Sequence, residues 1–206
     1  MAVNSAPGLR ERKKQETREA LSWATLRLAV EHGIDKVLVE DIAAAAGVSP
    51  RTFNNYFSSK YDAITFRHRD RFERAAAALR ERPPGEPLWE AITAAALQQF
   101  GVDTDSTPET TWTTGVATMM TDPAFVGSFL RAAAMGEHRV AEAIAERTGA
   151  DVHTDLHPRL AAAAVSSAVR IASELWISAD PPVAIGPLIR SALAQIAAGL
   201  PAHPTT

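Results

Sequence analysis

Apolar residues recur every three or four positions along most of the chain, which is the period of helices with one buried face. Leu21, Ala24 and Leu28 form such a stripe, so a first helix is predicted over about residues 17–31, and Gly33 ends it. From residue 60 on, turn and cap residues separate further apolar stripes. Helices are predicted there over about 60–80, 88–100, 108–120, 123–148, 157–178 and 183–198.

A sharp turn interrupts the pattern between residues 39 and 60. A helix beginning near Val39 is followed by Gly47, the residue type that most easily adopts the left-handed conformation found after a helix. Ser49 can cap a second helix with its hydroxyl group, and Pro50 suits the first helical position, where no amide hydrogen is needed. The stretch therefore predicts two helices joined by a tight turn.

The second, short helix has one aromatic face and one polar face. Phe53 and Phe57 are four residues apart and can anchor this helix to a core. Arg51, Asn54 and Asn55 are then expected on the side of the helix that faces away from this core. A helix that presents Arg and Asn outward is suited to the major groove of DNA.

These residues carry a family resemblance over roughly residues 15–65. The pattern Ile-Ala-x-x-Ala-Gly-Val-Ser at 42–49, then Thr-Phe-x-x-Tyr-Phe at 52–57 and Ser-Lys at 59–60, resembles the DNA-binding domain of TetR-type (tetracycline-repressor-like) transcriptional regulators. The resemblance implies base contacts from Arg51, Asn54 and Asn55. It implies further DNA contacts from Ser49, Pro50, Thr52, Tyr56 and Lys60, the last three with phosphates.

The chain departs from the family pattern at Leu38. Many family members have a threonine there, which caps the next helix and often touches a phosphate, and a leucine side chain can do neither. Glu40 and Asp41 still favour the positive end of that helix dipole.

The distribution of charge agrees with a separate DNA-contacting head. The chain has 206 residues, 46% of them apolar, and a net charge of −3. Residues 1–80 carry +4 and the remainder −7, so a basic N-terminal part precedes an acidic one. The absence of cysteine excludes disulfides and thiolate metal sites, and it fits a cytoplasmic protein, as does the lack of a long apolar run or a signal-like N-terminus.

A proline-rich segment at residues 83–87 marks a domain boundary. The expected organisation is a flexible basic arm (1–14), a helix-turn-helix domain (15–60), a linking helix (61–82), a C-terminal domain (83–200) and a tail (201–206). The fold class is all-α, with about nine helices.

The C-terminal domain has two predicted features. The last two helices are rich in Ala and Ser, which lets helix axes approach closely, and the resemblance implies that they pair with a second subunit to form a homodimer. The resemblance also implies a pocket for a small, largely apolar effector. Its candidate lining residues, which could equally be plain core, are Trp89, Phe100, Trp112, Met119, Met120, Phe125, Phe129 and Trp176.

No catalytic, cofactor or metal site is expected. His153 and His157 are four residues apart, but Asp155 lies in a predicted connection between helices, so no clear third metal ligand accompanies them. The Gly-x-Ser-x-Gly and Walker patterns are absent. The sequence thus favours a ligand-responsive repressor that binds a palindromic operator. The alternatives left open are an activator, and a helical carrier or enzyme whose DNA-binding head is vestigial.

Overall fold

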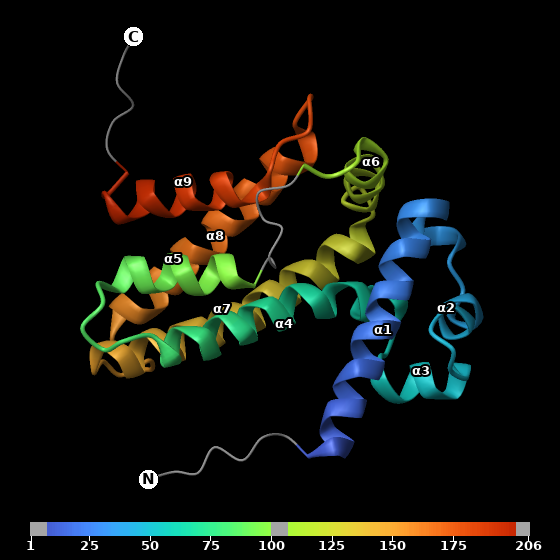
Figure 1. Cartoon of the computed structure of the whole chain (residues 1–206), viewed down its shortest axis with the longest axis horizontal. Coiled ribbons are helices and arrows are strands. Elements are labelled where there is room, and N and C mark those ends of the chain that lie inside the picture. The colour runs from blue at the N-terminus through green and yellow to red at the C-terminus, as the bar shows by residue number, and fades with distance from the viewer. Residues whose placement is uncertain (1–7, 100–106, 201–206) are drawn as a thin grey trace.

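The computed structural model describes residues 8–99 and 107–200, and all regular structure within these residues is helical (Figure 1). A 3₁₀ turn at Ile34–Lys36 follows the first helix. The α-helices are α1 (Leu9–His32), α2 (Val39–Ala45), α3 (Pro50–Tyr56), α4 (Lys60–Glu81), α5 (Leu88–Gln98), α6 (Thr110–Met119), α7 (Pro123–Thr148), α8 (Leu156–Ser178) and α9 (Ile185–Ala197).

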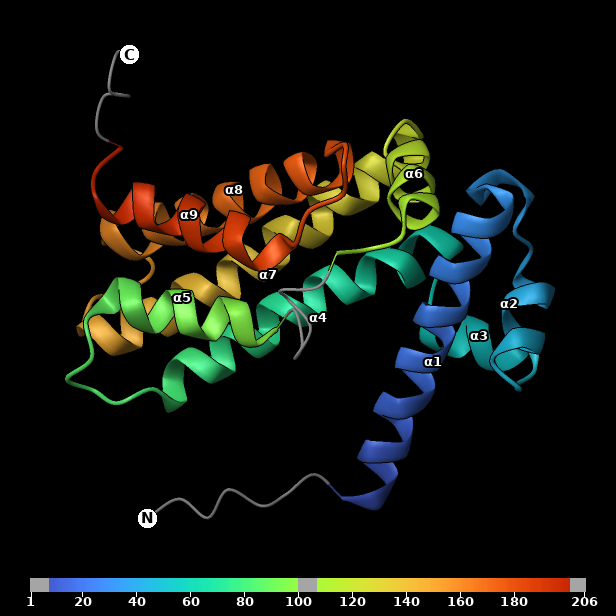
Figure 2. The same ribbon diagram turned by 45° about the horizontal axis from the view of Figure 1, so that its top comes forward.

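A small head is formed by α1, α2 and α3 at one end of the molecule (Figure 2). Its core contains Leu21 from α1, Ile42 from α2 and Phe53 from α3, all fully buried. Inside this core the Ser22 hydroxyl donates to the backbone carbonyl of Ala63 at 2.6 Å, which ties α1 to α4. The head is therefore joined to the start of α4 by both packing and a buried hydrogen bond.

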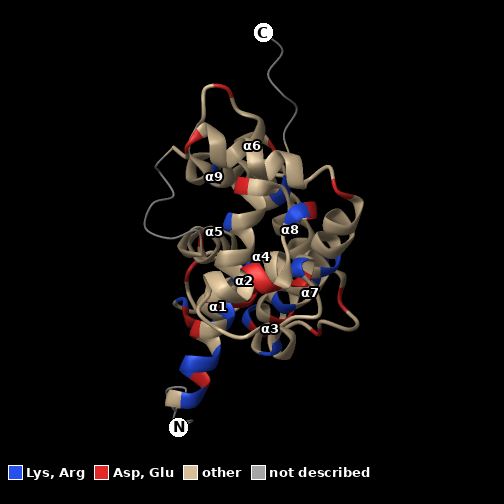
Figure 3. Cartoon of the chain, turned by 90° about the vertical axis from the view of Figure 1, so that its right-hand side faces the viewer, with Lys and Arg blue, Asp and Glu red and all other residues tan. Residues whose placement is uncertain are grey.

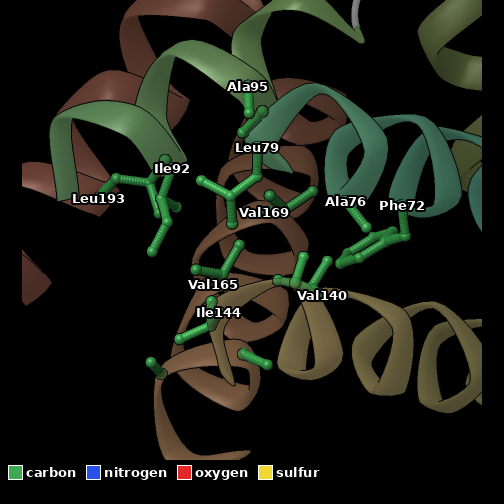
Figure 4. Packing of buried hydrophobic residues seen from close by; sticks show 14 of the residues in the cluster. Phe72, Ala76, Leu79, Ile92, Ala95, Val140, Ile144, Val165, Val169 and Leu193 are labelled. Carbon is green, nitrogen blue, oxygen red and sulfur yellow. The ribbon is translucent and has the colours of Figure 1, made fainter. Parts of the chain in front are cut away.

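Helices α4, α5, α7, α8 and α9 form a bundle around a second core (Figure 4), whereas α6 packs against α1 and α8. The helices α4 and α7 run in the same direction. Tyr61 at the start of α4 donates to Asp122 at the start of α7 at 3.2 Å, and Arg80 near the end of α4 pairs with Glu146 near the end of α7 at 2.6 Å. α5, α8 and α9 cover this pair. The labelled core side chains are Phe72, Ala76 and Leu79 of α4, Ile92 and Ala95 of α5, Val140 and Ile144 of α7, Val165 and Val169 of α8, and Leu193 of α9.

The predicted flexible arm is wrong over residues 9–14. This segment forms the first turns of α1, so the helix begins eight residues before the predicted start. Gly8 is the last helix-disfavouring residue, and the Arg, Lys, Glu and Gln residues that follow have high helix propensity. Glu11 lies in the first turn, near the positive end of the helix dipole, and pairs with Lys14 at 3.6 Å.

The other predicted helices are confirmed, with ends that shift by one or two residues where they can be compared. Pro83 and its neighbours separate α4 from α5 as expected, and Arg147 of α7 donates to the carbonyls of Pro83 and Glu86 at 2.6 and 2.8 Å, which holds this connection on the bundle. Residues 1–7 of the predicted arm and the tail at 201–206 lie outside the described residues.

Candidate nucleic-acid interface and effector cavity

The turn between α2 and α3 has the predicted conformation. Gly47 has a φ of +68°, in the left-handed region, and the Val48 amide closes the turn on the carbonyl of Ala43 at 2.9 Å. Ser49 caps α3 by accepting from the amide of Thr52 at 3.1 Å, and Pro50 occupies the first position of the helix. Residues within the turn itself therefore set its conformation and cap the start of α3.

Two aromatic rings hold α3 against the head. Phe53 and Phe57 are buried, and the Phe57 ring packs edge-on against Phe66 of α4, with 5.7 Å between ring centroids. The guanidinium of Arg18, on α1, lies 5.8 Å from the centre of the Phe57 ring and 4.8 Å from that of Phe66. The short helix is thus anchored to both α1 and α4.

The opposite face of α3 is polar and exposed. Arg51, Asn54 and Asn55 are exposed, and none of the three side chains is hydrogen-bonded within the part of the chain that the structure describes. Ser49 and Pro50 are exposed beside them, whereas Thr52 and Tyr56 are half-buried. The Thr52 hydroxyl lies 2.9 Å from that of Ser49. These seven residues, all predicted from the sequence to contact DNA, therefore share one accessible surface.

Basic side chains also lie on the first turns of α1. In Figure 3, which looks at the head, Lys and Arg residues colour the N-terminal turns of α1 and part of the region around α3. The basic residues on the first turns of α1 are Arg10, Arg12, Lys13 and Lys14. Because DNA affinity depends on neutralising phosphates, this helical segment extends the possible contact surface beyond α3.

Lys60 has a different environment from the one predicted. Its ammonium donates to the backbone carbonyls of Ile34, Asp35 and Val37 at 2.6, 3.3 and 3.2 Å. An ammonium has three donors, so a direct phosphate contact would require one of these bonds to be given up. Lys60 therefore stabilises the turn that precedes α2, a task that sequence reasoning missed.

Leu38 stands at the N-cap of α2, as predicted. Its side chain is 58% exposed and makes no capping hydrogen bond. Instead of a cap, the first turn of α2 has two acidic side chains, Glu40 and Asp41, which interact favourably with the positive end of the helix dipole.

A cavity of about 480 Å³ lies where the head meets the bundle. Its wall is built by α1, α4, α6, α7 and α8, with the start of α9 at one side. Six of the predicted lining residues contribute to it, namely Trp112, Met119, Met120, Phe125, Phe129 and Trp176. Met119 and Phe125 are also buried members of the head core, so lining the cavity and packing the core are not exclusive roles.

Two predicted lining residues are not found there. Trp89 packs partly buried against the larger core at α5 and is not among the side chains that line this cavity. The reason is that α5 covers the far half of the bundle, next to α4 and α9, while the cavity lies near the head. Phe100 lies outside the described residues.

The polar part of the wall was missed by sequence reasoning. Arg67, His68 and Arg71 of α4 line the cavity, together with Trp23 of α1. The charged residues of this stretch of α4 are typical of a solvated helix face. A signal was present, since positions 67, 68 and 71 lie three, four and seven residues after the buried Ile64 and therefore share its helical face.

Burial changes the titration of these groups. The pKa of His68 falls to about 4, chiefly because burial disfavours the charged ring and secondly because Arg71 is close. Its ring lies 4.3 Å from that of Phe129 and 5.0 Å from that of Phe72, centroid to centroid. Burial, followed by Arg71 and Arg74, lowers the pKa of Arg67 to about 10. At neutral pH His68 is therefore uncharged and Arg67 is a cation.

The outer face of α8 and α9 is apolar and uncovered. Large exposed side chains on α8 include Leu160, Ile171 and Leu175, which are 63%, 46% and 54% exposed. A shallow groove of about 380 Å³ between the two helices is lined largely by alanine, leucine and isoleucine. Among the described residues α8 is also the one helix long and apolar enough to cross a membrane, a test that core helices of globular proteins pass as well.

His153, Asp155 and His157, the candidate metal ligands, form no metal site within residues 8–99 and 107–200. No group of three or more His, Asp or Glu side chains gathers there. Asp155 instead accepts from the amide of Asp151 at 2.8 Å, and Asp151 accepts from that of His153 at 2.8 Å, so the carboxylates shape the turn before α8.

Sequence comparisons match both halves of the chain. A family model described as "Bacterial regulatory proteins, tetR family" matches residues 23–62, and one described as "MftR C-terminal domain" matches residues 86–201. The chain is 33% identical over 176 residues to the HTH-type transcriptional regulator TcmR of Streptomyces glaucescens, which covers 84% of this chain and 78% of TcmR.

Solved structures share the fold at lower identity. A TetR-family transcriptional regulator from Syntrophomonas wolfei is 17% identical, with a TM-score of 0.63, covering 91% of this chain and 98% of that one. FadR of Thermus thermophilus in complex with lauroyl-CoA is 18% identical, with a TM-score of 0.51 and coverages of 92% and 98%. A complex of SmeT with triclosan is 15% identical, with a TM-score of 0.56 and coverages of 90% and 91%; SmeT is a repressor of a multidrug efflux pump in Stenotrophomonas maltophilia.

Proposed function

The chain belongs to the TetR family of bacterial transcriptional regulators, and from this premise we propose that it is a repressor released from its operator by a small molecule. The observation that carries the proposal is the position of the cavity. Its wall includes side chains of α1 and α4, the same helices that anchor α3. A molecule bound there would contact the support of the DNA-reading helix directly.

The polar face of α3 supports direct reading of base edges. Arg51 is exposed near the start of the helix, and a guanidinium can bind the O6 and N7 atoms of guanine together. Asn54 and Asn55 are exposed as well, and an amide can pair with adenine. Thr52, Tyr56 and the basic first turns of α1 would contact phosphates.

The uncovered face of α8 and α9 supports a homodimer. Exposed leucine and isoleucine side chains beside an alanine-rich groove are what a two-fold helix bundle would bury. A dimer would place two copies of α3 on successive major grooves, about 34 Å apart, and so would read a palindromic operator. A cytoplasmic location follows from this task.

The solved relatives support a small-molecule effector of apolar character. FadR of T. thermophilus holds lauroyl-CoA and SmeT holds triclosan. The cavity described above has mainly aromatic and aliphatic walls, which suit such compounds.

Selection of bound sequences from random duplexes would test DNA reading. We expect a palindrome whose half-sites are separated by about one helical turn. Arg51→Ala should relax the preference at one operator position by about 1–3 kcal/mol, whereas Arg139→Ala, on the exposed face of α7, should leave the selected sequence unchanged. Equal weakening on every sequence would restrict Arg51 to phosphate contacts. No salt-sensitive binding to any duplex would favour the carrier or enzyme alternative.

The dimer is tested separately by sedimentation of a variant. Leu175→Arg places a charge on the proposed interface at a position that is exposed in one chain, so the single chain should still fold. We expect the variant to sediment as a monomer and to lose operator affinity, while its helical circular dichroism stays unchanged. A dimer that persists would mean that another face joins the subunits.

A further inference from the structure

A histidine on the cavity wall has no hydrogen-bond partner within residues 8–99 and 107–200. His68 of α4 lines the cavity, and two hydrocarbon rings pack against its imidazole, that of Phe72 at 5.0 Å and that of Phe129 at 4.3 Å between centroids. Burial, followed by Arg71, lowers the pKa of His68 to about 4, so the imidazole is neutral near pH 7. A neutral imidazole presents one hydrogen-bond donor and one acceptor.

Four other polar side chains of the wall are already engaged within their own helices. The hydroxyls of Thr65 and Ser173 donate to carbonyls one turn back, at 2.9 and 2.7 Å, and Arg170 pairs with Glu174 at 2.6 Å along α8. The imidazole of His68 has no such partner and is half-buried. Because an unpaired polar group in a poorly solvated place costs free energy, a bound molecule that supplies the missing hydrogen bond would gain affinity from it.

The wall that surrounds His68 is largely aromatic. Phe129 of α7 packs on His68 and lines the cavity together with Trp112 of α6 and Trp176 of α8. Aromatic rings pack favourably against other rings, so a planar body suits this wall. A phenol combines such a ring with a hydroxyl group, and with a pKa near that of tyrosine, about 10, it stays uncharged at neutral pH.

We infer that the effector is an aromatic compound with a phenolic hydroxyl group, which donates to the unprotonated ring nitrogen of His68 while the ring of the compound packs beside Phe129 and Trp176. This inference rests on the proposed function for the role of the cavity, but it concerns the chemistry of the ligand alone. His68 belongs to α4, the helix whose Phe66 packs against Phe57 at the end of α3, so the bond would act on the support of the DNA-reading helix.

The test compares 4-phenylphenol, 4-methoxybiphenyl and 4-methylbiphenyl, which differ only at one position. Binding to the full-length protein without DNA is followed by tryptophan fluorescence, since Trp23, Trp112 and Trp176 line the cavity. A methyl group is about as large as a hydroxyl group but more apolar, so burial alone would make 4-methylbiphenyl the tighter ligand. We expect the reverse, with the phenol binding roughly fivefold or more tightly. The methoxy compound can accept but not donate a hydrogen bond and should not share this preference.

Variants identify the group that recognises the hydroxyl. His68→Phe keeps a ring but removes both nitrogen atoms, and it should weaken binding of the phenol by roughly fivefold or more while binding of 4-methylbiphenyl stays within about twofold. His68→Gln has an amide oxygen that can accept, and it should restore part of the preference for the phenol. His138→Gln, on the exposed face of α7, should change neither ligand.

Circular dichroism checks that each variant is folded, and His68→Leu takes the place of a phenylalanine variant that is not. Equal binding of the phenol and the methyl compound, no binding of the phenol, or a preference that survives removal of the imidazole would overturn the inference. A parallel loss of both ligands in His68→Phe would assign a purely structural task to the histidine and overturn it as well. A gel shift separates these outcomes from the proposed function: recognition of the phenol through His68 without release of operator DNA would contradict effector-controlled repression and leave the ligand chemistry standing.

Discussion

Acid should destabilise this protein through one half-buried histidine. His68, on α4, lies between the rings of Phe72 of α4 and Phe129 of α7. Burial, aided by Arg71, lowers the pKa of His68 to about 4. In the unfolded chain the same side chain has a pKa of about 6.5. Between these two values the unfolded state binds a proton that the folded state does not, so the free energy of unfolding falls as the pH falls.

The size of this effect follows from the two pKa values. Each pKa unit corresponds to about 1.4 kcal/mol, so the complete loss, reached below pH 4, is about 3 kcal/mol. Above about pH 7 His68 contributes no loss, because the ring is neutral in both states. By about pH 5 the expected loss is about 2 kcal/mol, a large part of the stability of an ordinary domain.

Urea unfolding at about pH 7.5 and pH 5, at one fixed protein concentration, measures this loss. His68→Gln replaces the ring by a neutral side chain, and we expect the variant to lose about 2 kcal/mol less than the natural protein over that interval. His138→Gln is the matched control, since His138 is an exposed residue of α7 that faces Glu142 at 3.3 Å. The reasoning is refuted if the natural protein and His68→Gln show the same pH dependence, or if His138→Gln removes as much of it.

Three substitutions test other contacts. Gly115→Ala would place a methyl group 2.7 Å from the Val30 side chain, and we expect it to lower the free energy of unfolding by about 1–3 kcal/mol. Gly127→Ala, whose methyl group would meet only the Arg131 side chain at 3.6 Å, should not. Leu38→Thr should supply the missing cap of α2 and raise the stability by about 0.5–2 kcal/mol relative to Leu38→Ala in thermal melts. Lys60→Ala should destabilise the head by about 1–3 kcal/mol without changing the salt dependence of DNA binding, and a slope lower by about one unit would instead assign Lys60 to a phosphate.

The helix-turn-helix could be predicted because its determinants are local. Gly47, Ser49 and Pro50 act within a few residues of chain, and Phe53 and Phe57 need only a core on one side. A short segment that sets its own caps, turn and apolar face leaves few alternative structures.

The cavity could be predicted only in part because its wall depends on long-range packing. Trp89 and Trp112 look alike in sequence, yet α5 carries the first to the bundle core and α6 carries the second to the cavity. Arg67 and Arg71 belong to a charged stretch that resembles a solvated face, and only the approach of α6, α7 and α8 encloses them. The start of α1 was missed for a related reason, since a cluster of positive charges is compatible with either a tail or an exposed helix.

The cavity and the helix α3 are connected through shared buried side chains. Met119 and Phe125 line the cavity and are at the same time buried in the core that holds Phe53 and Phe57. Tyr61, at the start of α4, donates to Asp122, which caps the first turn of α7 through the amides of Ala124 and Phe125. A ligand that displaces Phe125 would therefore disturb the head core and the cap of α7 in one step, without a chain of intermediate contacts. Coupling of about 1–3 kcal/mol, which would weaken operator binding by roughly 5- to 150-fold, requires only that the side chains shared by cavity and head pack differently in the two states.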